Sequence, residues 1–401
     1  MSGPPCRRSG TPKTRPVFGT VATVESDIRL SDDPRLIHPA LRSYRLAPGP
    51  TGGGVVAGSF GRVRALGPLT LAALAAAVSL VPLGPDAAAL ASTSTVPARS
   101  SAGCAAAQPV TPGSSNQPLA AGGDEGAYVR EVPPSYSGRT PLPVVIDLHG
   151  WGEQAAFQVQ ITKLGDYGAA HGFITITPQV TEPALVWRLG SSGKDVVFMG
   201  ALLDTVEKTL CIDTNRIYVT GYSYGAFLTS TLACVYARRI AAVAPVAGIQ
   251  NPAGCHPSRP VPVVAFHGTA DPFVPYLGGI GSASLKLPAP DGSHRTLGQA
   301  LGKKASKFKG PTIPDNTAAW AKRNGCAPRP TERSVATRVT LIAYSCPKGD
   351  AVELYRVTGG GHAWPGSPAS KAIAPVVGYT TMAISADQIM WAFFVAHPLR
   401  R

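Results

Sequence analysis

From about residue 127 to the C-terminus, short apolar runs alternate with longer stretches that fit helices. The runs are almost entirely apolar, which is typical of parallel strands covered by helices on both faces. We predict strands at 144–148, 173–177, 216–220, 242–246, 261–266 and 351–357. Helices fit at 155–170, 195–210, 224–237 and 315–323, with a last one at 385–396. This alternation predicts an α/β fold with a mainly parallel sheet flanked by helices in a single domain.

The first 125 residues differ in composition and are rich in Pro, Gly and Ser. An apolar run at 65–83 follows two arginines and precedes a small-x-small sequence at 89–91, an order typical of a secretory signal peptide. We therefore predict an N-terminal extension with a signal over 1–91, a flexible mature N-terminus over 92–125 and the folded domain over 126–401. Because a signal normally begins a chain, we interpret the polar stretch before it as the product of a start codon assigned too far upstream. A retained membrane anchor is the alternative, but the run is short and interrupted by Gly and Pro.

Composition favours a globular protein, since 44% of the residues are apolar and 15% are charged. The formal net charge of +14 leaves +9 for residues 92–401, with 27 Lys or Arg against 18 Asp or Glu. No element combines clustered Lys and Arg with aromatic residues or a known nucleic-acid module, so we expect no nucleic-acid partner.

Six of the seven cysteines lie after residue 91. They form no CxxC pair and no histidine stands at metal-ligand spacing, so we expect disulfides in an oxidising compartment and no metal site. Six cysteines leave 15 pairings open, of which Cys326 with Cys346 is the best single pair because it flanks one turn and strand. Buried free thiols are the alternative.

A serine flanked by glycines follows the predicted strand at 216–220. The sequence Gly221-Tyr-Ser223-Tyr-Gly225 leads directly into the predicted helix at 224–237. Although GxSxG alone occurs by chance in a Gly-rich chain, the strand–turn–helix context is that of a nucleophile elbow. We predict Ser223 as a nucleophile; an ordinary glycine-rich turn is the alternative.

A serine nucleophile needs a base and an acid that orients the base, and in this fold both follow the serine, the acid first. Asp271 lies in the loop after the strand at 261–266, and His362 lies in a Gly-rich loop after the strand at 351–357. We predict Asp271 as the acid and His362 as the base. A turn-forming aspartate before proline and a structural histidine are the alternatives. His267 is a rival base, but it stands only four residues before Asp271.

Acyl transfer also needs donors for the developing oxyanion. The backbone N–H of Tyr224, directly after the serine, is the first candidate. The loop after the strand at 144–148 supplies the second, for which we predict the N–H of Trp151 and interpret His149 as a structural residue.

Together these motifs resemble the secreted esterase family that includes polyhydroxybutyrate depolymerases, feruloyl esterases and acetylxylan esterases. The matching segments are LHGWG, CIDTNRIYVTGYSYGAF, AVAPVAG, HGTADPFVPY, NGC and GGGHAWPG, spread over about residues 127–398. The resemblance implies an α/β-hydrolase catalytic domain over 126–401 with the triad roles given above. It also implies that Trp364 lines the substrate pocket.

Residues 278–312 form a Gly- and Lys-rich stretch that is longer than the connection expected from the resemblance. One interpretation is that it rims the active site; the other is a solvated surface loop. The basic residues in it are Lys286, Arg295, Lys303, Lys304, Lys307 and Lys309.

These observations predict a secreted, monomeric serine carboxylic ester hydrolase that needs no cofactor and has no stable membrane partner. Tyr222 and Trp364, with Trp151 and Tyr224, predict an aromatic mouth that binds a sugar or ferulate ring. We therefore favour plant cell-wall polysaccharide esters over polyhydroxybutyrate or another short-chain polyester. A peptidase of the same fold and a non-catalytic secreted binding protein are the other function classes.

Overall fold

The computed structural model describes residues 96–105, 110–181 and 185–400. The predicted extension and signal over 1–91, with the apolar run at 65–83, lie outside the described residues. The described part is built on a 10-stranded sheet with strand order β1-β2-β4-β3-β5-β6-β7-β10-β9-β8. The strands are β1 (Gly113–Ala121), β2 (Asp124–Val132), β3 (Leu142–Leu148), β4 (Ile174–Val180), β5 (Ile212–Tyr222), β6 (Ala242–Val246), β7 (Val263–Gly268), β8 (Thr331–Ala336), β9 (Val339–Tyr344) and β10 (Val352–Val357).

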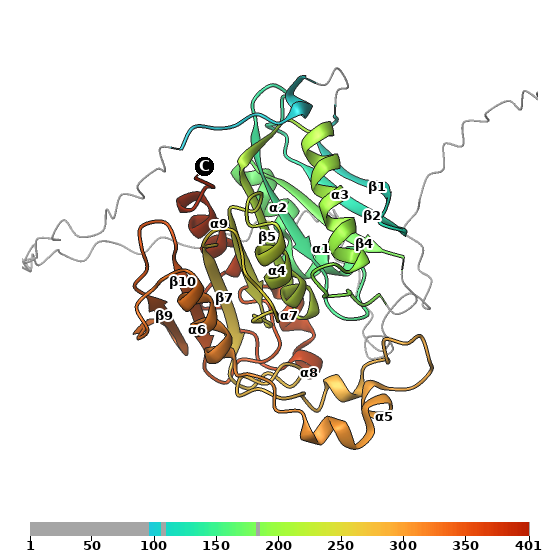
Figure 1. Ribbon diagram of the computed structural model, residues 1–401, viewed down its shortest axis with the longest axis vertical. Helices are drawn as coiled ribbons and strands as arrows, with labels where there is room; N and C mark the ends of the chain where they lie inside the picture. Colours follow the sequence, from blue (N-terminus) through green and yellow to red (C-terminus); the bar gives the residue numbers. More distant parts are fainter. Residues whose placement is uncertain (1–95, 106–109, 182–184, 401) are drawn as a thin grey trace, which may run out of the picture. The chain divides into compact units, whose positions relative to one another are not determined.

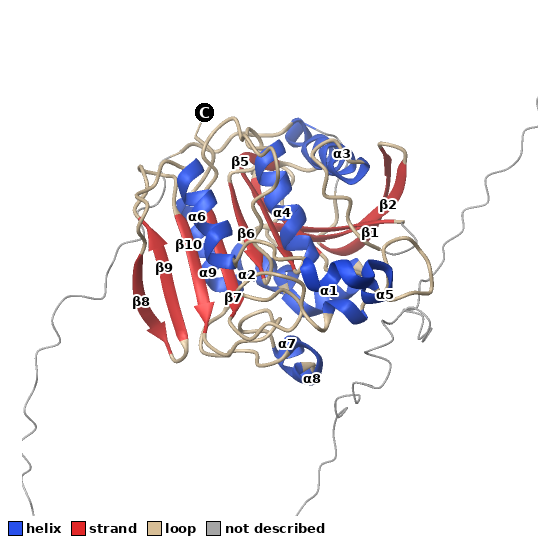
Figure 2. Cartoon of the chain, turned by 60° about the horizontal axis from the view of Figure 1, so that its bottom comes forward, coloured by secondary structure: helices blue, strands red, loops and turns tan. Residues whose placement is uncertain are grey.

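The centre of the sheet is parallel and its two edges are antiparallel. Strands β4, β3, β5, β6, β7 and β10 pair in parallel, whereas β1 and β2 at one edge and β9 and β8 at the other pair antiparallel (Figure 2). This is the architecture of an α/β hydrolase and confirms the predicted fold class. Because the C-terminal ends of parallel strands lie on the same side of a sheet, the loops after β3, β5, β7 and β10 come together on that side.

Helices cover both faces of the sheet (Figure 1). They are α1 (Ala155–Thr162), α2 (Leu164–His171), α3 (Lys194–Thr209), α4 (Tyr224–Val235), α5 (Leu297–Leu301), α6 (Ile313–Arg323), α7 (Pro368–Ala372), α8 (Ala374–Val377) and α9 (Ala386–Ala396). One core cluster holds Leu202 of α3, Leu232 of α4 and Trp320 of α6. The other holds Leu164 of α2 and Phe394 of α9. The apolar strands are therefore buried on both faces, as their composition predicts.

The predicted helix at 155–170 is two helices in the structure. Lys163 separates α1 from α2 and adopts a left-handed conformation with φ 54°. A non-glycine residue in this region does not continue a right-handed helix. The sequence has no glycine or proline at Lys163 to mark the break.

Within the segment 92–125, which we predicted to be flexible, the described residues include a strand. Where the structure describes them, residues 113–121 form β1, which pairs along its length with β2. Upstream, the N–H of Ser101 donates to the carbonyl of Ile212 at 3.0 Å, and Cys104 is disulfide-bonded to Cys211. The sequence of β1 is polar and contains proline, so it does not show the apolar pattern of a strand. An edge strand tolerates such a sequence because few of its positions are buried.

The six cysteines after residue 91 form three disulfides, which confirms that prediction. The pairs are Cys104–Cys211, Cys234–Cys255 and Cys326–Cys346, so the predicted pair of Cys326 with Cys346 is also confirmed. No helix within the described residues is both long and apolar enough to cross a membrane.

Candidate active site

Ser223 occupies a sharp turn between β5 and α4. Its backbone has φ 57° and ψ −117°, a strained conformation for a residue with a side chain. The N–H of Ser223 donates to the carbonyl of Val246 at 2.9 Å, which ties the turn to the neighbouring strand β6. The strand–turn–helix arrangement expected of a nucleophile elbow is therefore present, with Ser223 at its tip.

The second glycine of the motif lets the nucleophile helix approach the neighbouring loop. A Cβ atom at Gly225 would lie 2.2 Å from the carbonyl oxygen of Leu148 and 2.5 Å from that of His149. Any larger residue at this position would push α4 away from the loop that follows β3. The GxSxG pattern thus answers a packing requirement as well as a chemical one.

Asp271 and His362 are hydrogen-bonded to each other although 91 residues separate them in the chain. His362 Nδ1 lies 2.7 Å from Asp271 Oδ2, and the other oxygen of Asp271 accepts the N–H groups of Phe273 and Val274, each at 2.8 Å. Both side chains are buried, with 5% of Asp271 and 4% of His362 exposed. This geometry can hold the imidazole in one orientation and leave Nε2 to act as a base.

The electrostatics of Asp271 favour its ionised form. Burial by itself would raise the pKa of Asp271, but the charge of His362 and its hydrogen bond, followed by His267 and the Val274 N–H, outweigh burial and hold the pKa below its usual value. Asp271 is therefore ionised at neutral pH and can accept a hydrogen bond from His362 Nδ1.

Close packing between backbones brings the acid and the base together. A Cβ atom at Gly268, the last residue of β7, would lie 2.2 Å from the carbonyl oxygen of Gly360 in the histidine loop. Only glycine at Gly268 allows this approach. The paired strands β7 and β10 thus end in two loops that touch, one carrying Asp271 and the other His362.

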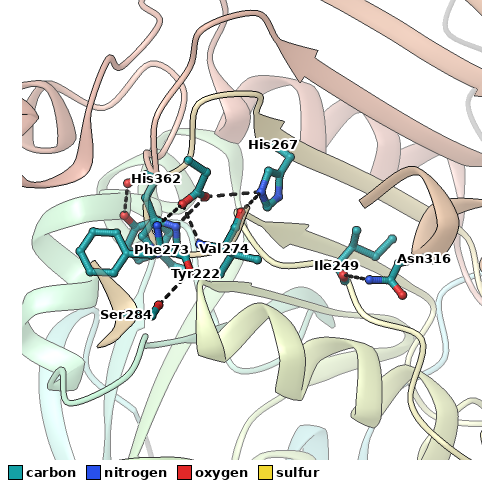
Figure 3. A network of polar contacts seen from close by, with 9 residues as sticks. Tyr222, Ile249, His267, Phe273, Val274, Ser284, Asn316 and His362 are labelled. Carbon is teal, nitrogen blue, oxygen red and sulfur yellow. Dashed lines mark hydrogen bonds and ion pairs between the residues drawn. The ribbon is translucent and has the colours of Figure 1, made fainter. Parts of the chain in front are cut away.

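His267, the rival base, lies on the other side of the same carboxylate (Figure 3). Its Nε2 is 2.8 Å from the carbonyl oxygen of Val274 and 3.4 Å from Asp271 Oδ2. Burial lowers the pKa of His267 more than the nearby Asp271 raises it, so the ring is neutral and donates to Val274. His267 fits a structural role that holds the turn after Asp271.

The two residues predicted to donate to an oxyanion lie next to each other. The rings of Trp151 and Tyr224 make an edge-to-face contact with centroids 4.9 Å apart. A hydrogen bond fixes the loop of Trp151, because the Trp187 indole N–H donates to the carbonyl of His149 at 2.8 Å. Burial lowers the pKa of His149 to about 4, so His149 is neutral, as its predicted structural role requires.

Glu153 is a residue of this loop that sequence reasoning missed. Its Oε2 accepts the N–H of Gly150 at 2.8 Å, so it closes the loop around Trp151. Burial raises the pKa of Glu153 to about 7, although the Gly150 N–H and the charge of His362 act in the opposite direction. Its place two residues after Trp151 could have indicated a role in the loop. A single glutamate in a polar loop, however, is too common to be singled out from the sequence.

Two aromatic residues predicted to bind substrate are buried instead. Trp364 is 0% and Tyr222 2% exposed. The Trp364 indole donates to Asp387 Oδ1 at 2.8 Å, and the Tyr222 hydroxyl donates to the carbonyl of His362. Burial raises the pKa of Tyr222 well above its usual value, which keeps that donor protonated. Neither side chain presents a surface to a substrate, so we correct their role to positioning His362 and its loop.

Within the described residues, no group of three or more His, Cys, Asp or Glu side chains could hold a metal ion.

Several curated proteins match part of this chain. A probable feruloyl esterase C from Aspergillus oryzae is 30% identical over 213 residues, which cover 50% of this chain and 77% of the relative. The chain belongs to the same family as this feruloyl esterase. The expected family resemblance is thus confirmed for the feruloyl esterases, although no family model matches the chain.

Other members of the feruloyl esterase family and its neighbours match over shorter spans. Feruloyl esterase B from Piromyces equi is 31% identical over 185 residues, 44% of this chain and 31% of the relative. A bifunctional acetylxylan esterase/xylanase from Neocallimastix patriciarum is 29% identical over 134 residues, 33% of this chain and 20% of the relative. The chain thus spans about a third and a fifth of the length of these two proteins. Among solved structures, an acetyl xylan esterase from Aspergillus awamori has a TM-score of 0.45 and 16% identity over 70% of this chain and 99% of its own, a level from which we infer nothing further.

We predict that Trp364→Phe lowers stability and leaves substrate affinity unchanged. The variant removes the donor to Asp387, a buried carboxyl whose pKa burial raises to about 7, and a lost buried hydrogen bond costs about 1–3 kcal/mol. Urea unfolding and the KM for methyl ferulate measure the two effects. A tenfold rise in KM at unchanged stability would restore Trp364 to the substrate pocket.

We predict that Glu153→Gln stabilises the protein more at pH 8 than at pH 5. The folded-state pKa of about 7 exceeds the ordinary value of 4.5, so the folded state binds the proton more tightly. The stabilising contribution of the protonated group is complete below pH 4.5 and is lost as pH rises through 7. Glutamine stays neutral, so the difference in unfolding free energy between variant and wild type should grow by about 1–3 kcal/mol over this range. A difference that does not change with pH would contradict the assignment.

Proposed function

We propose that this chain is a secreted serine carboxylic ester hydrolase that acts on ester groups of plant cell-wall polysaccharides. The observation that carries the proposal is the buried Asp271–His362 pair beside the strained turn of Ser223. Tyr222, the residue before the nucleophile, links the two, because its ring lies 4.9 Å from that of His362. The three disulfides support secretion, since such bonds persist in oxidising compartments.

In the proposed reaction, Ser223 Oγ attacks the ester carbonyl carbon while His362 Nε2 takes its proton. The N–H groups of Tyr224 and Trp151 stabilise the negative charge on the carbonyl oxygen. When the tetrahedral intermediate collapses, the bond to the alcohol breaks and His362 protonates the leaving oxygen. Water then attacks the acyl-enzyme with His362 again as the base, releasing the acid and regenerating Ser223.

The relatives support wall esters over polyesters as substrates. They are named as feruloyl esterases and as a bifunctional acetylxylan esterase/xylanase. The aromatic surface that could contact a ferulate or sugar ring is smaller than the sequence suggests, because Tyr222 and Trp364 are buried. Trp151 and Phe273, both partly exposed beside the proposed triad, are the rings that we assign to substrate contact.

We predict that Ser223→Ala and His362→Ala each reduce kcat for methyl ferulate by more than about 10³-fold without unfolding the protein. Asp271→Asn should be nearly as damaging, because the N–H groups of Phe273 and Val274 would hold the amide oxygen, and the amide NH2 would then donate to Nδ1 and favour the wrong imidazole tautomer. Steady-state kinetics and far-UV circular dichroism measure activity and folding. Retention of a tenth of the wild-type kcat by Ser223→Ala would reject the nucleophile.

We also predict a higher kcat/KM for methyl ferulate or acetylated xylan than for hydroxybutyrate oligomers. This ratio reports differential binding of the transition states. A clear preference for the hydroxybutyrate oligomers would reject wall esters as substrates and leave the triad intact. Cleavage of amide reporters at comparable rates would indicate a peptidase.

A further inference from the structure

The connection between β7 and α6 concentrates positive charge. Residues 278–312, which we call the basic lobe, contain six Lys or Arg and one Asp, a net charge of +5. Residues 92–401 together contain 27 Lys or Arg and 18 Asp or Glu, a net charge of +9. More than half of the positive excess therefore lies in the basic lobe.

The basic lobe is attached to the turn that carries Asp271. The N–H of Ala283 donates to the carbonyl of Pro272 at 3.1 Å, and the hydroxyl of Ser284 donates to the carbonyl of Phe273 at 2.8 Å. The ring of Phe273 in turn lies 4.8 Å from that of His362, and Figure 3 shows Ser284, Phe273 and His362 in one cluster. One side of the basic lobe thus borders the proposed base.

Another part of the basic lobe reaches the loop on the other side of the proposed site. The indole N–H of Trp151 donates to the carbonyl of Pro288 at 3.0 Å. Pro288 also forms a bridge with Thr296, whose side chain caps α5 in a capping box. The basic lobe therefore spans from the acid turn to the loop of the predicted oxyanion donor and forms part of the rim of the proposed site.

The positive charges of the basic lobe are exposed, and its lysines have no ion-pair partner among the described residues. Arg295 pairs with Asp291 at 2.7 Å, but in the part of the chain that the structure describes no ion pair involves the lysines of the lobe. Phe308, 55% exposed, stands between Lys307 and Lys309, so this segment combines clustered lysines with an aromatic residue, which the sequence analysis overlooked. These lysines, all exposed, are Lys286, Lys303, Lys304, Lys307 and Lys309.

We propose that the basic lobe binds the carboxylate groups of an acidic polysaccharide, namely a xylan substituted with uronic acids. This binding holds the polysaccharide beside Ser223. The proposal rests on the ester-hydrolase function above and specifies its polymeric substrate. Ammonium groups spaced along an exposed segment attract carboxylates spaced along a polysaccharide, and an exposed aromatic ring offers a stacking face for a sugar. A small ester such as methyl ferulate has no carboxylate to use this surface.

The test compares two full-length variants that each lose four positive charges. The lobe variant carries Lys303→Gln, Lys304→Gln, Lys307→Gln and Lys309→Gln. The control variant carries Lys208→Gln, Lys322→Gln, Arg329→Gln and Lys348→Gln. These exposed residues lie on segments that precede β5, β8 and β10, at the ends of the strands away from Ser223. Binding is measured to de-esterified glucuronoxylan, to the same polymer after reduction of its carboxyl groups, and to inorganic polyphosphate.

We expect the lobe variant to bind glucuronoxylan about fivefold more weakly than wild type, since four surface charges together contribute about 1 kcal/mol. The control variant should bind as wild type does, and wild type should bind the carboxyl-reduced polymer about fivefold more weakly. For the lobe variant, the ratio of kcat/KM on acetylated glucuronoxylan to that on methyl ferulate should fall by the same factor. Raising salt should remove these differences.

Equal binding by wild type and the lobe variant would overturn the proposal, as would equal binding to the native and carboxyl-reduced polymers. Tighter binding to polyphosphate than to glucuronoxylan would overturn the choice of uronate as the ligand. The esterase function is tested separately: if wild type hydrolyses neither methyl ferulate nor acetylated xylan, that function fails whatever the binding data show.

Discussion

The hydrogen bond between Asp271 and His362 is the interaction on which the rest of the proposed site depends. It joins two loops that are 91 residues apart in the chain, and it does so out of contact with water. A buried carboxylate is stable only when its charge and lone pairs are satisfied, and here two backbone N–H groups and an imidazole satisfy them. The pairing of β7 with β10 and the bare backbone at Gly268 make this contact possible.

The residues around Asp271 and His362 orient these two side chains and have little surface for binding a ligand. His267 holds the turn of Asp271, and Tyr222 holds the backbone of His362. Trp364 packs below the same loop and is fixed by Asp387. An aromatic side chain in a motif next to a catalytic residue is therefore poor evidence for a substrate pocket. It is equally suited to filling the space beneath a loop that must not move.

The same turn that carries Asp271 also supports the basic lobe. Phe273 contacts His362 with its ring and accepts a hydrogen bond from the basic lobe with its carbonyl, while Trp151 contacts both Tyr224 and Pro288. The surface that surrounds Ser223 is thus built on the loops that hold the chemistry. Changes in the basic lobe can alter which polymers reach the serine and leave the buried acid–base pair as it is.

The sequence by itself determined the fold class, the helices that alternate with the central strands, and the disulfide of Cys326 with Cys346. These features depend on local patterns: apolar runs for buried parallel strands, and two cysteines that flank one short segment, which is the β8–β9 hairpin in the structure. It also named Ser223, Asp271 and His362, because each follows a recognisable strand in the order that the fold requires. The antiparallel strands β1, β2, β8 and β9 were not predicted. In the edge strands β1 and β8 the exposed polar residues leave little trace in the pattern of apolar positions.

Only the tertiary structure decided which aromatic residues are buried and which charged residues meet. Burial of Trp364 and Tyr222 depends on elements that are far apart in sequence, such as α9 with Asp387 and β5 with the loop of His362. The raised pKa of Glu153 depends on how completely its loop is covered, and the place of the basic lobe depends on its contacts with Phe273 and Trp151. None of these properties can be read from the spacing of residues along the chain, because each depends on how separate segments pack against one sheet.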